Sequence, residues 1–265
     1  MSRHFGLQSQ AIAAIFVMVF HAASARAQNS PASAPGDAEI VTDRPDVTES
    51  SIVVPVASLQ FENGFAWTSD HGAHAVDLPE TLVRLGILAR TEFRFVVPNG
   101  LLRSGSASGF DDLAIGMKQQ LGPLPGGIDL SVIAAVSLPA GSRGVGSGGY
   151  DPFVKFPWSK DLARGWSIGG MQSWFWNSDG GRRNDVWEAT FYLEKQITQR
   201  LDAFTEYAGD YAQRGGPKQL LHFGGAYKLN ALNQVDFHFG FGLSHATPNH
   251  FFAAGYSVRF DKLWR

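Results

Sequence analysis

The stretch that decides the fold reads Val235-Asp236-Phe237-His238-Phe239-Gly240-Phe241-Gly242-Leu243. Apolar side chains stand at every second position, and Asp, His or Gly fills each position between them. Successive side chains of a β-strand point to opposite faces, so this period of two predicts a strand with one apolar and one polar face. Residues 252–260 repeat the pattern after a polar loop, which predicts an antiparallel partner strand.

The same alternation recurs along most of the chain and predicts about twelve strands. They lie at residues 59–67, 80–85, 92–97, 112–118, 128–136, 154–158, 166–176, 187–194, 201–208, 221–228, 235–243 and 252–260. Short links at 87–91, 122–127, 159–165, 196–200 and 229–233 alternate with longer polar loops at 68–75, 98–110, 138–150, 177–185, 210–219 and 244–251. An even number of strands with short periplasmic turns and longer outer loops is typical of outer-membrane barrels.

Charge within these strands falls almost entirely on one parity. Its members are Glu62, Glu80, Arg84, Glu92, Arg94, Asp112, Lys118, Asp129, Lys155, Glu188, Glu194, Asp202, Glu206, Lys228, Asp236 and Arg259. The other parity carries Phe, Leu, Val and Trp. Side chains already fill a barrel of about eight strands, so a wider barrel with this pattern turns its charges toward a wet lumen and its apolar side chains toward lipid. We therefore expect an all-β, antiparallel, up-and-down transmembrane β-barrel. A soluble sandwich or barrel is the alternative.

Composition excludes several classes of protein. The 265 residues include 22 Lys and Arg against 24 Asp and Glu, a formal net charge of -2, whereas nucleic-acid binders usually carry a basic surplus. The chain has no cysteine, which excludes disulfides, thiolate zinc sites and cysteine nucleophiles. The glycines of residues 141–149 lack the Gly-Lys-Ser/Thr of a phosphate-binding loop. We expect no cofactor, no metal site and no nucleic-acid partner.

The N-terminus has the features of a secretory signal peptide. An apolar run spans residues 11–20, and Ala25-Arg26-Ala27 fits the A-x-A cleavage pattern. We expect a signal peptide at 1–27, with an N-terminal membrane anchor as the alternative. A periplasmic arm at 28–57, a barrel at 58–260 and a short tail at 261–265 follow. The expected location is the outer membrane of a Gram-negative bacterium.

Two segments resemble known signatures. The motif Thr42-Asp43-Arg44-Pro45-Asp46-Val47-Thr48-Glu49-Ser50 is similar to the opening motif of the family called putative MetA-pathway of phenol degradation. That resemblance covers residues 42–260 and implies an outer-membrane transporter for phenolic or other aromatic compounds. Residues 255–260 resemble the terminal strand by which outer-membrane proteins contact their assembly machinery, so membrane lipid and that machinery are expected partners.

The arm and the second and third strands supply the first candidate site. We expect Asp43, Arg44, Asp46 and Glu49 to order the arm at the periplasmic mouth or inside the lumen, where Arg84, Arg94 and Arg259 offer partners. A disordered leader is the alternative. Glu80, Arg84, Glu92 and Arg94 are expected to form a charged ladder that narrows the pore. Like charges directly opposite are unfavourable, so we expect Arg84 to stand opposite Glu92 rather than opposite Arg94.

A second candidate site lies near the C-terminus. Counted from the turn at 229–233, His222 and His238 become diagonal neighbours on the lumen face, roughly 7–8 Å apart, with Asp236 nearby. They are candidates for a proton-responsive gate, because histidine titrates near neutral pH, or they simply contribute polarity to the lumen.

Function is expected to be the passive uptake of small molecules, without catalysis. A lipid-modifying enzyme and a structural or adhesive barrel are the alternatives. Ser244-His245 is the tempting catalytic pair, but adjacent residues of a strand point to opposite faces and cannot act on each other.

Overall fold

The computed structural model describes residues 39–179 and 182–264. Within these ranges no helix has the length and the apolar character that are needed to span a membrane. The elements are β1 (Leu59–Asp70), β2 (Ala73–Leu78), β3 (Leu82–Leu88), β4 (Thr91–Val96), β5 (Gly100–Arg103), β6 (Gly109–Phe110), β7 (Leu113–Gln120), β8 (Asp129–Leu138), β9 (Asp151–Asp161), η1 (Ala163–Gly165), β10 (Trp166–Phe175), β11 (Ser178–Asp179), β12 (Arg182–Arg183), β13 (Val186–Gln196), β14 (Leu201–Ala212), β15 (Pro217–Asn230), β16 (Asn233–Gly242) and β17 (His250–Phe260).

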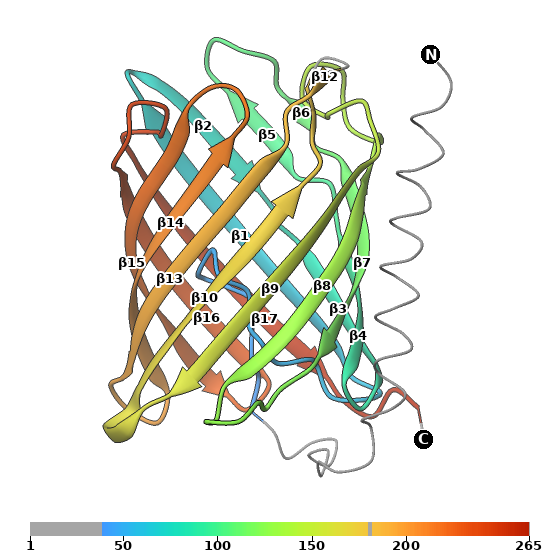
Figure 1. Ribbon diagram of the computed structural model, residues 1–265, viewed down its shortest axis with the longest axis vertical. Coiled ribbons are helices and arrows are strands. Elements are labelled where there is room, and N and C mark those ends of the chain that lie inside the picture. The colour runs from blue at the N-terminus through green and yellow to red at the C-terminus, as the bar shows by residue number, and fades with distance from the viewer. Residues whose placement is uncertain (1–38, 180–181, 265) are drawn as a thin grey trace.

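Twelve of these strands close into a barrel, as Figure 1 shows. The ring runs β1, β3, β4, β7, β8, β9, β10, β13, β14, β15, β16, β17. Every neighbouring pair is antiparallel, and β1 pairs with β17 from Leu59↔Phe260 to Ser69↔His250, which leaves the ring without an edge. The prediction of an antiparallel up-and-down barrel of about twelve strands is confirmed.

The two parities face opposite ways. Phe237, Phe239 and Phe241 of β16 are 40–49% exposed and point outward, whereas Glu62 and Lys118 are fully buried within the barrel. An apolar outer band with a polar interior is the arrangement that a lipid bilayer stabilises. The interior of the barrel is therefore not a dry apolar core, because buried charges need either an opposite charge or water beside them.

Three details differ from the sequence prediction. The predicted strand 80–85 begins later, at Leu82, because Glu80 takes a positive φ of 45° just before β3. The loop predicted at 68–75 contains the end of β1 and the start of β2, and the loop predicted at 98–110 contains β5 and β6. Strands β2, β5 and β6 extend the sheet beyond the ring beside β1. The long loop predicted at 210–219 is short, because β14 and β15 reach Ala212 and Pro217.

The two ends of the barrel are unlike. The end that we call the turn end carries the short links, such as the two residues between β15 and β16, and the opposite end is called the loop end. Residue 39 and the C-terminal residues both lie at the turn end, and the blue segment of Figure 1 runs from there into the barrel. The predicted signal peptide 1–27 and the first part of the predicted arm, 28–38, lie outside the described residues.

The outward apolar face predicts a depth-dependent cost of charge. Phe237→Arg, in the middle of β16, should destabilise the barrel in lipid by about 2–4 kcal/mol, because the cation would face the bilayer core. Leu243→Arg follows the same strand at the loop end and should cost about 0–1 kcal/mol. Equilibrium unfolding in guanidinium from lipid vesicles measures both, and equal costs would contradict a membrane-facing β16.

Candidate functional site

The interior of the barrel holds residues 39–57, which we call the arm. The arm is tied to the wall at both ends, since Ile40 N donates to Ala231 O at 2.8 Å and Ala57 N donates to Gly86 O at 2.9 Å. Gly86 has no side chain, and Pro55 O lies only 1.9 Å from the place where a Cβ would stand. A larger residue at position 86 would therefore exclude the arm from this part of the wall.

One side of the lumen carries a cluster that we call the cationic row: Arg84 of β3, Arg94 of β4, Lys118 of β7 and Lys155 of β9. Asp43 of the arm meets three of its members. Its carboxylate lies 2.5 Å from Arg94 Nη1, 2.9 Å from Lys118 Nζ and 3.3 Å from Arg84 Nη1. Ser50 N also donates to Asp43 Oδ1 at 2.9 Å, which closes the arm on itself.

Glu49 holds the other end of the cationic row. Its two carboxylate oxygens lie 2.5 Å from Arg94 Nη2 and 2.6 Å from Lys155 Nζ. The wall itself contributes Glu62 and Glu92, which lie 2.9 Å from Arg84 Nη1 and Nε respectively. Four cations are thus balanced by two carboxylates of the wall and two of the arm.

The predicted register of β3 and β4 is wrong. Arg84 stands directly opposite Arg94, and Glu92 stands opposite Gly86, with an irregularity between Gly86 and Leu88. The repulsion of the two guanidinium groups is offset because Asp43 contacts both of them and Glu92 Oε1 lies 2.8 Å from Arg94 Nη1. The expected Arg84–Glu92 ion pair does form, but diagonally across the strands.

The opposite side of the lumen is acidic, and Glu206 of β14 is its anchor for the arm. Val47 N and Thr48 N donate to its two oxygens at 2.8 and 2.9 Å. The Thr48 hydroxyl bonds both Glu206 and Thr190 of β13. His222 Nε2 lies 2.6 Å from Glu206 Oε2. This carboxylate, only 1% exposed, is therefore satisfied mainly by backbone N–H groups and a histidine rather than by a lysine or arginine.

Arg44 reaches a third part of the wall. Its Nη1 lies 2.7 Å from Glu80, and its Nη2 lies 3.4 Å from Asp236. Gly64 and Gly255 face each other across β1 and β17, and a Cβ at either position would stand within 2.4 Å of the Arg44 guanidinium. The two glycines leave the space in which that guanidinium lies.

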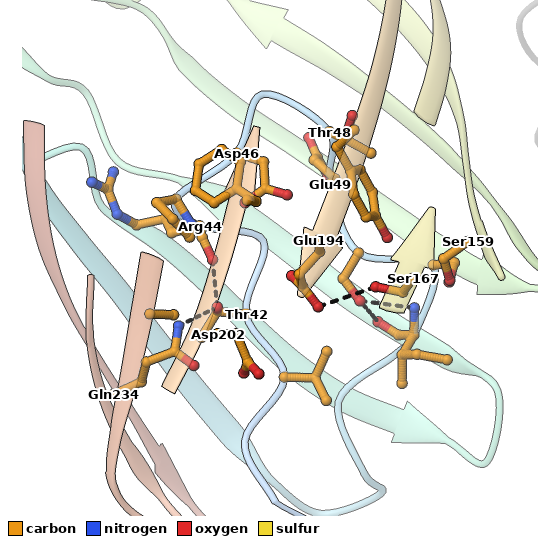
Figure 2. A pocket seen from close by; sticks show the side chains of 18 of the residues that line it. Thr42, Arg44, Asp46, Thr48, Glu49, Ser159, Ser167, Glu194, Asp202 and Gln234 are labelled. Carbon is orange, nitrogen blue, oxygen red and sulfur yellow. Dashed lines mark hydrogen bonds between the residues drawn. The ribbon is translucent and has the colours of Figure 1, made fainter. Parts of the chain in front are cut away.

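A polar cavity of about 430 Å³ lies below the arm, toward the turn end, and Figure 2 shows its lining. The wall side includes Tyr192, Glu194 and Asp202, and Ser167 donates to Glu194 at 3.2 Å. Asp46 of the arm faces this cavity, and no ion pair joins it to a cation among the described residues. Burial and the carboxylates of Glu206 and Glu194 raise the pKa of Asp46 well above its ordinary value.

A second cavity of about 610 Å³, which we call the vestibule, lies at the loop end. Phe175, Glu188, Asp210 and Lys218 are among its lining residues. On β13, Glu188 lines the vestibule and Tyr192 lines the lower cavity, and the residue between them on the lumen face is Thr190. The contact of Thr48 with Thr190 and Glu206 therefore separates the two cavities along this wall.

The predicted site residues fall into these groups. Arg84, Glu92 and Arg94 lie together, Glu80 and Asp236 share Arg44, and His222 lies on Glu206. His238 is the diagonal neighbour of His222 in the register of β15 and β16, and their Nδ1 atoms are 3.4 Å apart. Arg259 donates to Glu39 O at 3.1 Å and pairs with Asp261.

Four important residues were not singled out from the sequence: Glu62, Lys118, Lys155 and Glu206. In the sequence these four residues share the parity of the predicted site residues. That parity places their side chains on the lumen face but does not show which of them the arm contacts. Ser244, the nucleophile of the alternative catalytic pair, donates its hydroxyl to Pro217 O at the start of β15, at 2.7 Å. Among the described residues, no group of three or more His, Asp or Glu side chains is placed to hold a metal.

Comparison with known proteins identifies the family of the chain and solved structures with a similar fold. The family model described as "Putative MetA-pathway of phenol degradation" matches residues 42–260. No curated protein matches the chain. The chain is similar to an outer membrane channel from Pseudomonas putida F1, with a TM-score of 0.62 at 12% identity over 88% of this chain and 100% of that one. It is also similar to the NanC porin, with a TM-score of 0.54 at 10% identity over 76% and 98% of the two chains. At these identities the likeness establishes the fold alone.

The arm contacts predict opposite effects for two neighbouring aspartates. Asp43→Asn should weaken docking of the arm by about 3 kcal/mol, because Arg94 and Lys118 would lose a buried carboxylate. Asp46→Asn should leave docking unchanged or strengthen it, since Asp46 faces other carboxylates. The chain has no cysteine, so labelling of Ser51→Cys by a thiol reagent reports release of the arm. Equal labelling rates in the two variants would contradict this assignment.

The pH dependence of docking follows from the same groups. Burial alone would raise the pKa values of Asp43 and Glu49, but the cationic row holds both below their ordinary values, so their contribution is present above about pH 4 and is lost on acidification. The raised pKa of Asp46 has the opposite effect. The contribution of Asp46 to docking of the arm is present below about pH 4 and is lost as the pH rises through the raised pKa. Because the thiolate fraction by itself accelerates labelling as the pH rises, the labelling rate of Ser51→Cys is divided at each pH by the rate in the denatured protein. This ratio should rise from mildly acidic values upward, and Asp46→Asn should remove that rise. A rise that persists in Asp46→Asn would assign it to another group.

Proposed function

The chain belongs to the family described as "Putative MetA-pathway of phenol degradation", and we propose that it is an outer-membrane channel through which small solutes diffuse passively. The observation that carries the proposal is the pair of cavities inside a closed barrel with an apolar outer band. One cavity opens toward each end, and the contact of Thr48 with Thr190 and Glu206 lies between them. Solutes therefore meet the arm as the barrier on the path.

The arm sets how much of the lumen is free. A ring of twelve strands is wider than its own inward side chains can fill, and the space left over is shared by the arm and the two cavities. Hydrogen bonds and ion pairs hold residues 42–50 of the arm, whereas Ile40, Val53 and Val54 bury apolar side chains nearer its two ends. Release of residues 42–50 therefore exposes charged groups to water, in which they are readily solvated. A barrier of this kind can move without unfolding of the barrel.

Export and insertion complete the proposal. Residues 1–27 carry the A-x-A pattern of a cleaved signal peptide, and cleavage there would leave the arm at the periplasmic side of a Gram-negative outer membrane. The terminal strand β17 ends on Phe260 after alternating residues, the pattern by which assembly machinery would contact the chain. Catalysis forms no part of the proposed function.

Conductance tests the proposal. The barrel in planar bilayers should carry ionic current, and deletion of residues 39–50 should raise it several-fold, because this segment holds Asp43, Glu49 and the Thr48 contact. Heat-modifiable migration on gels and β-rich circular dichroism show that the deletion variant is folded. Absence of current and of solute uptake in both proteins, with folding intact, would favour a structural barrel.

A further inference from the structure

We propose that the lumen recognises solutes that carry an aromatic ring and a carboxylate. The carboxylate would bind between Arg94 and Lys155, and the ring would lie against Phe153 and Phe175. The inference rests on the proposed channel function and deepens it by naming the class of solute. Its basis is the balance of charge in the cationic row and the position of two aromatic side chains beside it.

The cationic row is a carboxylate site that the chain itself occupies. Its four cations meet two carboxylates from the wall, Glu62 and Glu92, and the remaining two come from the arm. Withdrawal of the arm would leave a positive surplus in this partly buried wall, in which Arg94 keeps Glu92 and Lys155 keeps only the more distant Glu188 of β13. A surplus of that kind draws in an anion, because the desolvated cations need a partner.

The geometry at Glu49 shows what kind of anion fits. One oxygen of its carboxylate lies 2.5 Å from Arg94 Nη2, and the other lies 2.6 Å from Lys155 Nζ. Both distances are those of charge-assisted hydrogen bonds, which are stronger than neutral ones. The side chains of Arg94 and Lys155 are only 6% and 16% exposed, so they are held in position rather than free in solvent. A solute carboxylate can replace that of Glu49 without any rearrangement of the wall.

Two aromatic rings lie next to this site, on the face that otherwise carries charge. Phe153 of β9 stands opposite Phe175 of β10, and their ring centroids are 5.5 Å apart. Lys155 Nζ lies 5.5 Å from both centroids. Phe153 precedes Lys155 by two residues, which is roughly 7 Å along a strand and comparable to the length of a benzoate ion. Ring and carboxylate would thus be contacted together.

The approach to the site is open from the loop end. Phe175 lines the vestibule, so a solute that enters there meets the aromatic pair before it reaches the cationic row. Lys155 and Arg94 lie beyond the rings, bound to Glu49. Exchange of the solute carboxylate for Glu49 would remove two of the ion pairs that tie the arm to the wall. Solute binding and opening of the path would then be one event.

The solute dependence of the ionic current in planar bilayers tests the inference on the full barrel. Benzoate carries both groups, benzamide has the ring without the charge, and acetate has the charge without the ring. Benzoate should change the current at a concentration about tenfold below that needed for benzamide or acetate, because an added charged hydrogen bond or a stacked ring contributes about that factor. Lys155→Gln should raise the effective benzoate concentration about tenfold relative to the benzamide concentration measured on the same variant.

Two further variants separate the ring from the charge. Phe153→Leu should bring the benzoate response close to that of acetate, since it removes one ring of the pair. Lys160→Gln removes a positive charge from the outer face of the same strand and should change neither response. Equal responses to benzoate and benzamide, or a benzoate response that survives Lys155→Gln, would overturn the inference while the ionic current still supports a channel.

Labelling of Ser51→Cys keeps the inference testable if the barrel carries no current. Benzoate, but not benzamide, should then accelerate labelling several-fold in detergent, because it competes with Glu49 for Arg94 and Lys155. Acceleration without current would support the carboxylate site and reject the channel. No acceleration would overturn the carboxylate site as well.

Discussion

A ring of twelve strands encloses more space than its inward side chains can fill, and one wall of this space carries three buried cations, which form ion pairs with two carboxylates of the wall, and the partly exposed Lys155. That imbalance is the constraint on which the interior depends. Removing a cation from water is costly unless an opposite charge replaces the lost hydration. Asp43 and Glu49 supply the two missing carboxylates, and the path of the arm follows from the need to bring both of them to the same wall.

Charge is also separated across the lumen. The cations lie on β3, β4, β7 and β9, while Glu188, Glu194, Asp202, Glu206 and Asp210 lie on β13 and β14. The arm connects the two sides with different chemistry, carboxylates toward the cations and backbone N–H groups toward Glu206. Each side holds residues 42–50 of the arm through polar groups that water can also satisfy, while buried apolar side chains of the arm, such as Ile40 and Val54, lie outside this stretch. A barrier made in this way is compatible with a passage for polar solutes.

The ion pairs between the arm and the cationic row contribute little net free energy of folding, and their larger effect is to fix the position of the arm. Ion pairs that are shielded from water gain Coulomb energy but lose hydration, so their net contribution is small compared with the cost of breaking them. Asp43 meets three cations and closes on Ser50, which leaves few other positions for the arm. Asp46, three residues later, meets no such partner and faces carboxylates instead. The two aspartates show that the position of a charge in the lumen, rather than its presence, decides its effect.

The period of two in residues 235–243 and in the other strands determined the barrel, because it fixes strand, face and an approximate strand count before any contact is known. The same parity placed Arg84, Arg94, His222 and Asp236 in the lumen. The parity does not predict which side chains pair with one another, since pairing depends on the register of the strands. The irregularity at Gly86 sets Arg84 opposite Arg94. Lys118 and Lys155 gained importance only when the arm brought Asp43 and Glu49 to them across 75 and 106 residues of sequence. Local alternation decides which way a side chain points, whereas only the closed barrel with the arm inside it decides what that side chain meets.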